Sequence, residues 1–93
     1  MVGTLIKKIY SYSDATLASG YKVSANNVTI DNNGKVTYID SANAYSDGTS
    51  FNFSVYKQGE NLVFNINSIP STVDGQGVIN EFITFVESDI VTL

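Results

Sequence analysis

The sequence predicts an α+β fold, in which a four- to five-stranded antiparallel β-meander carries one C-terminal amphipathic helix. Apolar and polar residues alternate over residues 50–69, which is the period of a strand with one buried face. Turn-forming sequences separate this stretch from similar ones before it. Apolar residues at helical spacing over residues 76–88 predict the helix. Such a meander should be strongly twisted and can curl into a small open barrel.

The length of the chain predicts one domain. Its 93 residues suffice for one hydrophobic core but not for a cofactor domain beside a substrate domain. We therefore expect a single domain over residues 1–93. Its parts are an N-terminal strand or short helix with a connection (1–20), the antiparallel meander (21–69), the C-terminal helix (76–88) and an apolar tail (89–93).

Residues 2–13 fit two kinds of secondary structure. The spacing of Leu5, Ile6 and Ile9 suits one face of a helix. The content of isoleucine, tyrosine and threonine favours a strand instead. We prefer the strand, followed by a connection over residues 14–20.

The next strand changes its pattern in the middle. Val23 and Ala25 stand at odd positions, whereas Val28 and Ile30 stand at even positions. One extra residue would bring both pairs to the same face of a sheet. The sequence therefore predicts a β-bulge at residues 26–27, which are both asparagine.

The sequence D-N-N-G-K at residues 31–35 predicts a tight turn. A three-residue loop N-N-G places Ile30 opposite Val36 and Asp31 beside Lys35. A two-residue loop would instead set Asp31 against Val36, so Val36 would face a charged residue and not Ile30. The three-residue loop is therefore preferred, with an ordinary hairpin turn favoured over a calcium loop because the closing glutamate is absent.

Residues 36–46 predict one long strand, and the D-G dipeptide after them predicts a hairpin turn to the next strand. That turn places Ala42 opposite Phe53, a small side chain against a large one. Asp40 is the misfit, because the same register sets it opposite Val55 on the core face. We expect either a bulge there or a carboxylate at the margin of the sheet.

The hairpin after this strand has the clearest alternation. A two-residue turn at residues 58–59 places Lys57 opposite Glu60 and Phe53 opposite Phe64. Each apolar residue then has an apolar partner, and the one charged pair is of opposite sign. A slip by one residue would turn asparagines into the core, so the faces are well specified.

The final part of the chain predicts a helix that covers the sheet. Pro70 cannot donate to a sheet and ends the meander. The G-Q-G sequence at residues 75–77 is not expected to bind an anion, because no lysine or arginine follows it. The apolar stripe of the helix consists of Val78, Ile79, Phe82, Ile83, Phe85 and Val86.

The predicted registers bring uncharged polar residues into rows on the face opposite the helix. Ile39 falls on this face, while Tyr38 falls on the core face. Freely solvated faces commonly carry lysine and glutamate, so amides, hydroxyls and tyrosines favour contact with a partner. A merely solvated face, or one covered by residues 2–13, is the alternative. The candidate interaction residues are Asn43, Asn52, Asn65, Tyr45, Tyr56 and Asn67.

The composition excludes several kinds of chemistry. The chain has no histidine, no cysteine and no arginine, which removes the usual general base, the thiolates and the bidentate anion grip. We expect no enzyme, and no catalytic, cofactor-binding or metal-binding residues. The net charge of −4 disfavours nucleic acid and anionic membranes. Analogy with barrels of the SH3 and Sm type suggests an Sm-like ring that binds nucleic acid, a hypothesis less favoured than the two that follow.

The leading hypothesis is a noncatalytic structural or interaction module, as a homo-oligomer or beside other protein subunits. Its low charge and its richness in Asn, Ser, Thr and Tyr resemble minor structural proteins of bacteriophages, in composition and without a shared motif. The alternative is a module that binds a neutral polar ligand, such as a sugar, on the Asn/Ser/Tyr face. The sequence shows no signal peptide and no transmembrane segment, which favours a cytoplasmic or virion-associated protein over a secreted one.

Overall fold

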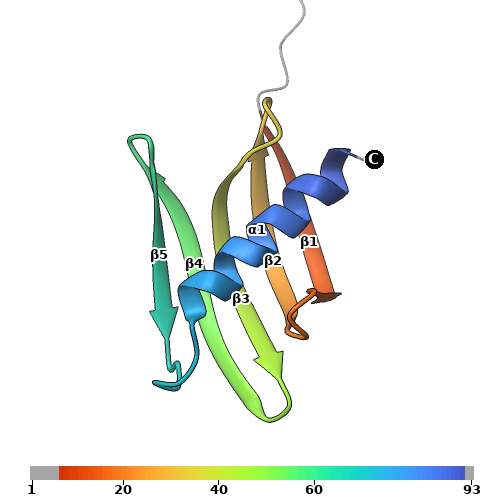
Figure 1. Cartoon of the computed structure of the whole chain (residues 1–93). Coiled ribbons are helices and arrows are strands. Elements are labelled where there is room, and N and C mark those ends of the chain that lie inside the picture. The colour runs from red at the N-terminus through yellow and green to blue at the C-terminus, as the bar shows by residue number, and fades with distance from the viewer. Residues whose placement is uncertain (1–6, 92–93) are drawn as a thin grey trace, which may run out of the picture.

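In the computed structural model, which describes residues 7–91, five strands form one antiparallel sheet and a helix crosses one face of it (Figure 1). The strands are arranged in sequence order, and β1 and β5 form opposite edges, so the sheet is open rather than closed into a barrel. The predicted α+β meander is therefore confirmed. The elements are β1 (Lys7–Thr16), β2 (Lys22–Asp31), β3 (Val36–Ser46), β4 (Thr49–Gln58), β5 (Asn61–Asn67) and α1 (Gly75–Val91).

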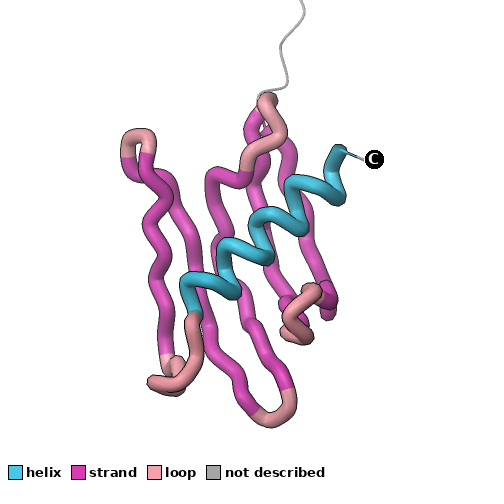
Figure 2. Tube along the Cα trace, in the orientation of Figure 1, coloured by secondary structure: helices cyan, strands magenta, loops and turns pink. Residues whose placement is uncertain are grey.

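The hydrophobic core lies between α1 and the sheet face beneath it (Figure 2). We call this the core face and the opposite one the outer face. The helix runs diagonally over the strands, and no other described segment lies over the outer face. The core side chains with at most 1% of their surface exposed are Val23, Val28, Ile30, Ile39, Ala44, Phe51, Val55, Ile79, Phe82 and Val86.

The N-terminus of α1 is fixed by a cap and by a close approach to β5. The Asp74 carboxylate accepts a hydrogen bond from the Gly77 N–H at 3.0 Å, which satisfies a free donor of the first turn. Gly75 packs so tightly that a Cβ there would lie 2.4 Å from Ile69 Cδ1 and 3.1 Å from Ile66 Cδ1. A larger residue at position 75 would therefore require the Ile69 side chain to move.

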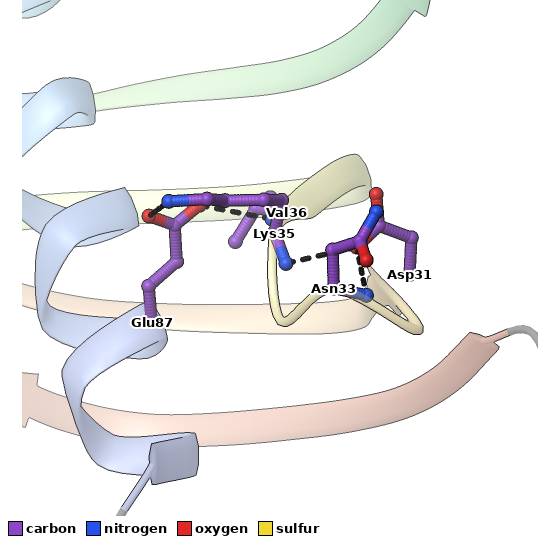
Figure 3. Close-up of polar contacts among 5 residues, drawn as sticks. All are labelled: Asp31, Asn33, Lys35, Val36 and Glu87. Atoms are coloured by element: carbon purple, nitrogen blue, oxygen red, sulfur yellow. Dashed lines mark hydrogen bonds and ion pairs between the residues drawn. The ribbon is translucent and has the colours of Figure 1, made fainter.

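Acidic side chains of α1 bind the backbone and side chains of the sheet layer. Glu87 accepts a hydrogen bond from the Val36 N–H at 3.0 Å and lies 3.9 Å from the Lys35 ammonium (Figure 3). Glu81 accepts one from the Ser19 N–H at 3.0 Å. These contacts fix the helix at points along its length, mainly by backbone hydrogen bonds, because an exposed ion pair such as that of Lys35 contributes little.

The D-N-N-G-K turn has the predicted three-residue form (Figure 3). The Asp31 N–H donates to the Lys35 carbonyl at 2.9 Å, and Gly34 has a φ of 78°. The Asp31 carboxylate accepts from the Lys35 N–H at 3.0 Å and the Asn33 N–H at 2.9 Å. These backbone donors, that of Lys35 first, lower the pKa of Asp31, and the side chain thus stabilises the turn as an anion.

The predicted bulge at residues 26–27 is confirmed. Between the pairs Tyr10–Val28 and Tyr12–Ala25, the two residues of β2 face Ser11 alone. Asn27 has a φ of 53°, a left-handed conformation that asparagine tolerates better than most residues. The bulge is what allows the odd and the even apolar positions of β2 to share one core face.

The faces predicted for Tyr38 and Ile39 of β3 were wrong. Ile39 is fully buried and pairs with Val28 and Val55, whereas Tyr38 is 42% exposed on the outer face. Of the two alternatives expected for Asp40, the structure has the bulge, because the register shifts between the Ile39–Val55 and Ala42–Phe53 pairs. A second shift between Thr29 and Ile30 exchanges the faces of Tyr38 and Ile39. A prediction that assumes regular alternation of buried and exposed residues cannot detect these two register shifts.

The hairpin of β4 and β5 was predicted two residues out of register. The turn residues are Gly59 and Glu60, so Val55 pairs with Phe64 and Phe53 with Ile66. Gly59 has a φ of 64°, and a turn with glycine first needs a positive φ only there. The predicted turn would have required a positive φ from Gln58 as well. Because the shift is an even number, every side chain of β5 keeps its predicted face.

The two ends of the chain extend the predicted elements. The preferred strand is found as β1, which runs to Thr16 and so takes part of the predicted connection; residues 2–6 lie outside the described residues. The helix predicted over 76–88 spans Gly75–Val91 and absorbs the start of the apolar tail, while residues 92–93 lie outside the described part.

Candidate functional site: the outer face of the sheet

All six candidate interaction residues lie on strands and point away from the core face. Asn43, Asn52 and Asn67 form one row across β3, β4 and β5, and Ser24 of β2 extends it. The register predicted from the sequence sets Asn65 opposite Asn52, and the shifted hairpin replaces it with Asn67. Asn65 lies beside Ser54, Tyr45 beside Ser50, and Tyr56 between Tyr38 and Val63.

A second row crosses the outer face and is less polar than predicted. Ile9, Thr29, Tyr38, Tyr56 and Val63 are direct partners from β1 to β5, and we call them the aromatic row. Ile9 is 58% exposed, Tyr38 42% and Tyr56 38%. Three large apolar side chains are therefore presented to the surroundings in one line.

The outer face is hollowed beside this row. The hollow has a volume of about 650 Å³, and the bulges of β2 and β3 bring Asn26, Asp40 and Ser41 to its wall. Most of its lining residues are serine or asparagine, which supply both donors and acceptors of hydrogen bonds. The further lining residues are Ser11, Tyr12, Ser13, Ser24, Ala25, Ala42, Asn43, Asn52, Phe53, Ser54 and Asn67.

The outer face carries carboxylates that the predicted rows did not include, and two tyrosines bind them. The Tyr38 hydroxyl donates to Asp40 at 3.0 Å, and the Tyr45 hydroxyl donates to Asp14. Asp14 has a φ of 54° at a bulge of β1 and also accepts from the Ser24 hydroxyl at 3.3 Å. These hydrogen bonds raise the pKa of Tyr38 and of Tyr45, so both phenols stay neutral donors.

A second hollow, also of about 650 Å³, lies between α1 and the loop after β1. Phe85 and Leu17 give it an apolar floor. Its carboxylates are already engaged, since Glu81 binds the Ser19 N–H and Asp89 accepts from the Tyr12 hydroxyl at 3.0 Å. Burial, then the bond to Asp89, raises the pKa of Tyr12 to about 12. These bonds tie α1 to β1 and to the loop after it, and they engage both carboxylates of this hollow.

The chemical groups of the outer face are amides, hydroxyls, phenol rings and carboxylates. Neither histidine nor cysteine occurs in the chain. Within residues 7–91 no group of acidic side chains could hold a metal ion, and no buried side-chain polar atom lacks a partner. No helix in this part of the chain has the length and apolarity to cross a membrane. What the face offers is hydrogen bonding beside exposed rings.

Sequence reasoning missed Tyr38, Ile9 and both carboxylates of the outer face. A signal for Tyr38 was present, because Ile39 and Ala42 are three residues apart with two polar residues between them. In the structure Asn26 pairs with Ser41, so the bulged segments of β2 and β3 lie beside one another. The chain matches no protein-family model, no curated protein and no solved structure.

Proposed function

We propose that this protein is a noncatalytic interaction module whose outer face binds another protein subunit, in a larger assembly or as a homo-oligomer. The aromatic row carries this proposal. The large apolar side chains exposed among the described residues are Ile9, Tyr38, Tyr56 and Leu62, and the first three lie in that one row. Exposed apolar residues are ordinarily scattered, whereas several in one row, here interrupted only by Thr29, are typical of an interaction surface.

The chemistry around the aromatic row suits a protein partner. Tyrosine is enriched in interfaces because its ring buries area while its hydroxyl keeps a hydrogen bond. Tyr38 already has its hydroxyl placed by Asp40, so less conformational entropy is lost when a partner covers the ring. The asparagines and serines of the hollow supply the polar rim that such interfaces have. A virus particle is one assembly that fits the low charge content of the chain, 15%.

Site-specific photo-cross-linking tests the proposal without knowledge of the partner. A photoreactive phenylalanine analogue replaces Tyr38 or Tyr56 in the full chain, in the cells that make the protein, and Gln76 on the exposed side of α1 is the matched control. We expect discrete protein cross-links from the first two positions and not from the third. A product at twice the chain mass of 10.1 kDa identifies a second copy, and any other mass a different subunit. Equal labelling from all three positions, or none, overturns the proposal.

A neutral polyhydroxylated ligand such as a sugar is the second candidate, and the hollow favours it. Its wall combines amide and hydroxyl groups with one carboxylate, that of Asp40, and Tyr38 lies beside it. Sugars bind through this combination of hydrogen bonds and ring contacts. A glycan array tests it: binding that Asn52→Ala removes and Gln76→Ala preserves would support the ligand, and an array without signal would exclude it.

A further inference from the structure

The two edges of the sheet differ in regularity. Register shifts interrupt the pairing of β1 with β2, and Asp14 of β1 has a φ of 54°. β5 pairs with β4 without a shift over its whole length, and none of its residues has a positive φ. Within the described residues, no backbone hydrogen bond joins the outer edge of β5 to another segment. β5 therefore presents a straight edge of N–H and C=O groups that can receive a strand.

The composition of β5 lacks the usual protection of an edge strand. Its sequence, N-L-V-F-N-I-N, contains no charged residue and no proline. Edge strands normally carry lysines, prolines or bulges that prevent a second chain from pairing with them. The net charge of the chain is −4, so two copies repel each other over much of their surface but not along this uncharged edge.

The sequence of β5 is also complementary to itself. Phe64 is its central residue, with Leu62 and Ile66 two positions away on either side and Asn61 and Asn67 at the ends. Two antiparallel copies related by a two-fold axis at Phe64 would therefore set Leu62 against Ile66, Phe64 against Phe64 and Asn61 against Asn67. The one unlike pair would be Val63 against Asn65, on the outer face. A two-fold interface requires this self-complementarity, because the same patch serves both partners.

The core face at β5 is incompletely covered. Leu62 is 38% exposed and Phe64 is half-buried, whereas Val55, the partner of Phe64 on β4, is fully buried. The first turn of α1 packs against Ile66, at the end of β5 that lies far from Leu62. A strand added beyond β5 would bring apolar side chains beside those that the helix leaves exposed.

We propose that β5 is a homodimerisation edge, at which two copies pair their β5 strands antiparallel about Phe64 and join their sheets into one. Both helices then lie on the same side, and the outer faces of the two copies form one continuous surface. The proposal rests on the edge and not on the outer face, so it stands or falls independently of the proposed function. A pairing of seven residues is smaller than a standard interface of roughly 1,600 Å², and we expect micromolar affinity.

Charge substitutions at the opposed positions Val63 and Asn65 test the pairing. In the two-fold arrangement, residue 63 of one copy faces residue 65 of the other on the outer side. The variant Val63→Lys/Asn65→Lys sets like charges together and should weaken the dimer about tenfold or more. The variant Val63→Lys/Asn65→Glu changes the same positions but sets opposite charges together, and it should dimerise about as well as the natural chain. Asn43→Lys, on central β3, should leave the dimer intact.

Sedimentation equilibrium from low to high micromolar concentration measures these affinities. A natural chain that stays at 10.1 kDa throughout overturns the proposal, as does equal weakening by the two double variants. Loss of the dimer with Asn43→Lys but not with the Lys/Lys variant would instead place the contact on the outer face. The cross-linking from Tyr38 tests the outer face, so its result is independent of these affinities.

An engineered cysteine reports the register, because the chain has no cysteine of its own. Phe64→Cys places two sulfur atoms at the two-fold axis, where paired Cα atoms lie about 4.5–5.5 Å apart and a disulfide can form. Asn61→Cys is the matched control, since two copies of residue 61 would lie roughly 20 Å apart, six residues along the strands. Rapid oxidation to a dimer at 64 and not at 61 is expected, and the reverse order contradicts the proposed register.

Discussion

The two faces of the sheet are made from alternate residues of the same strands, yet they differ in almost every property. On the core face, Phe51, Phe53 and Val55 are at most 2% exposed beneath α1. On the outer face, their neighbours Asn52 and Ser54 line the hollow. The period of two residues in β4 thus separates what stabilises the fold from what is free to bind. The difference can be tested with pairs of adjacent residues.

The largest difference is expected between Phe53 and Asn52. Phe53 pairs with Ala42 and Ile66, and its ring centre lies 6.3 Å from that of Phe82. Phe53→Ala should lower the free energy of unfolding by about 3–5 kcal/mol, because it leaves a cavity beneath the helix. Asn52→Ala, one residue away, should change it by less than about 0.5 kcal/mol. Denaturant unfolding measures both, and similar losses would mean that the two faces are not distinct.

A narrower test compares Tyr38 and Ile39. A strand with regular alternation would bury Tyr38 and expose Ile39, whereas the structure does the opposite. Ile39 is fully buried between Val28 and Val55, so Ile39→Ala should cost about 2–5 kcal/mol. Tyr38→Ala removes an exposed ring and its bond to Asp40 and should cost less than about 1 kcal/mol. Chemical denaturation of the two variants decides between the bulged and the regular strand, since the regular strand gives the opposite order.

The sequence predicts the fold wherever local chemistry determines the geometry. The D-N-N-G-K turn, the D-G turn with its Ala44–Phe51 pair and the bulge of β2 were all predictable, because each depends on a few neighbouring residues. The turn at Gly59 was not, since two alternatives with the same apolar faces differ only in which residue takes a positive φ. An even shift conserves the faces, and therefore hydrophobic pattern alone cannot detect it.

The candidate site was predicted in its residues more than in its arrangement. The asparagines and Tyr56 lie on the outer face as expected, because alternation holds in β4 and β5. The aromatic row was not predicted, since it depends on the irregularities of β3 that turn Tyr38 outward. Asp14 and Asp40 could not be placed either, because bulged residues follow no period. Bulges therefore shape this surface more than the regular strands do.

The bulge of β2 provides the third comparison, between two substitutions at one position. Asn27 has a φ of 53°, and a β-branched side chain resists this conformation. Asn27→Val should therefore cost roughly 1–2 kcal/mol, whereas Asn27→Gly should be close to neutral. Thermal unfolding of the pair measures the difference. Equal stability of the two variants would show that the left-handed conformation is not what fixes the bulge and, with it, the faces of β2.

The smallest expected effect concerns Tyr12, a tyrosine of the core face, in comparison with Tyr38 of the outer face. The Tyr12 ring packs edge-on to Phe82, with centroids 5.7 Å apart, and its hydroxyl donates to Asp89. Burial, then the bond to Asp89, raises its pKa from 10.0 to about 12, so folding favours the neutral phenol. The stabilisation from Tyr12 is therefore complete below pH 10 and is lost as the pH rises towards 12.

Tyr12→Phe should cost about 1 kcal/mol at neutral pH, because one hydrogen bond is lost and the ring packing is kept. The variant should also lose part of the alkaline decline in stability between pH 10 and 12, and phenolate absorbance should show that the last tyrosine to ionise is absent. Tyr38→Phe is the control. The bond to Asp40 also raises the pKa of Tyr38, but that bond lies in open solvent, where screening leaves it little effect on stability. If both variants decline with the same slope, the alkaline transition does not depend on the core face, and the pKa of Tyr12 is not coupled to folding.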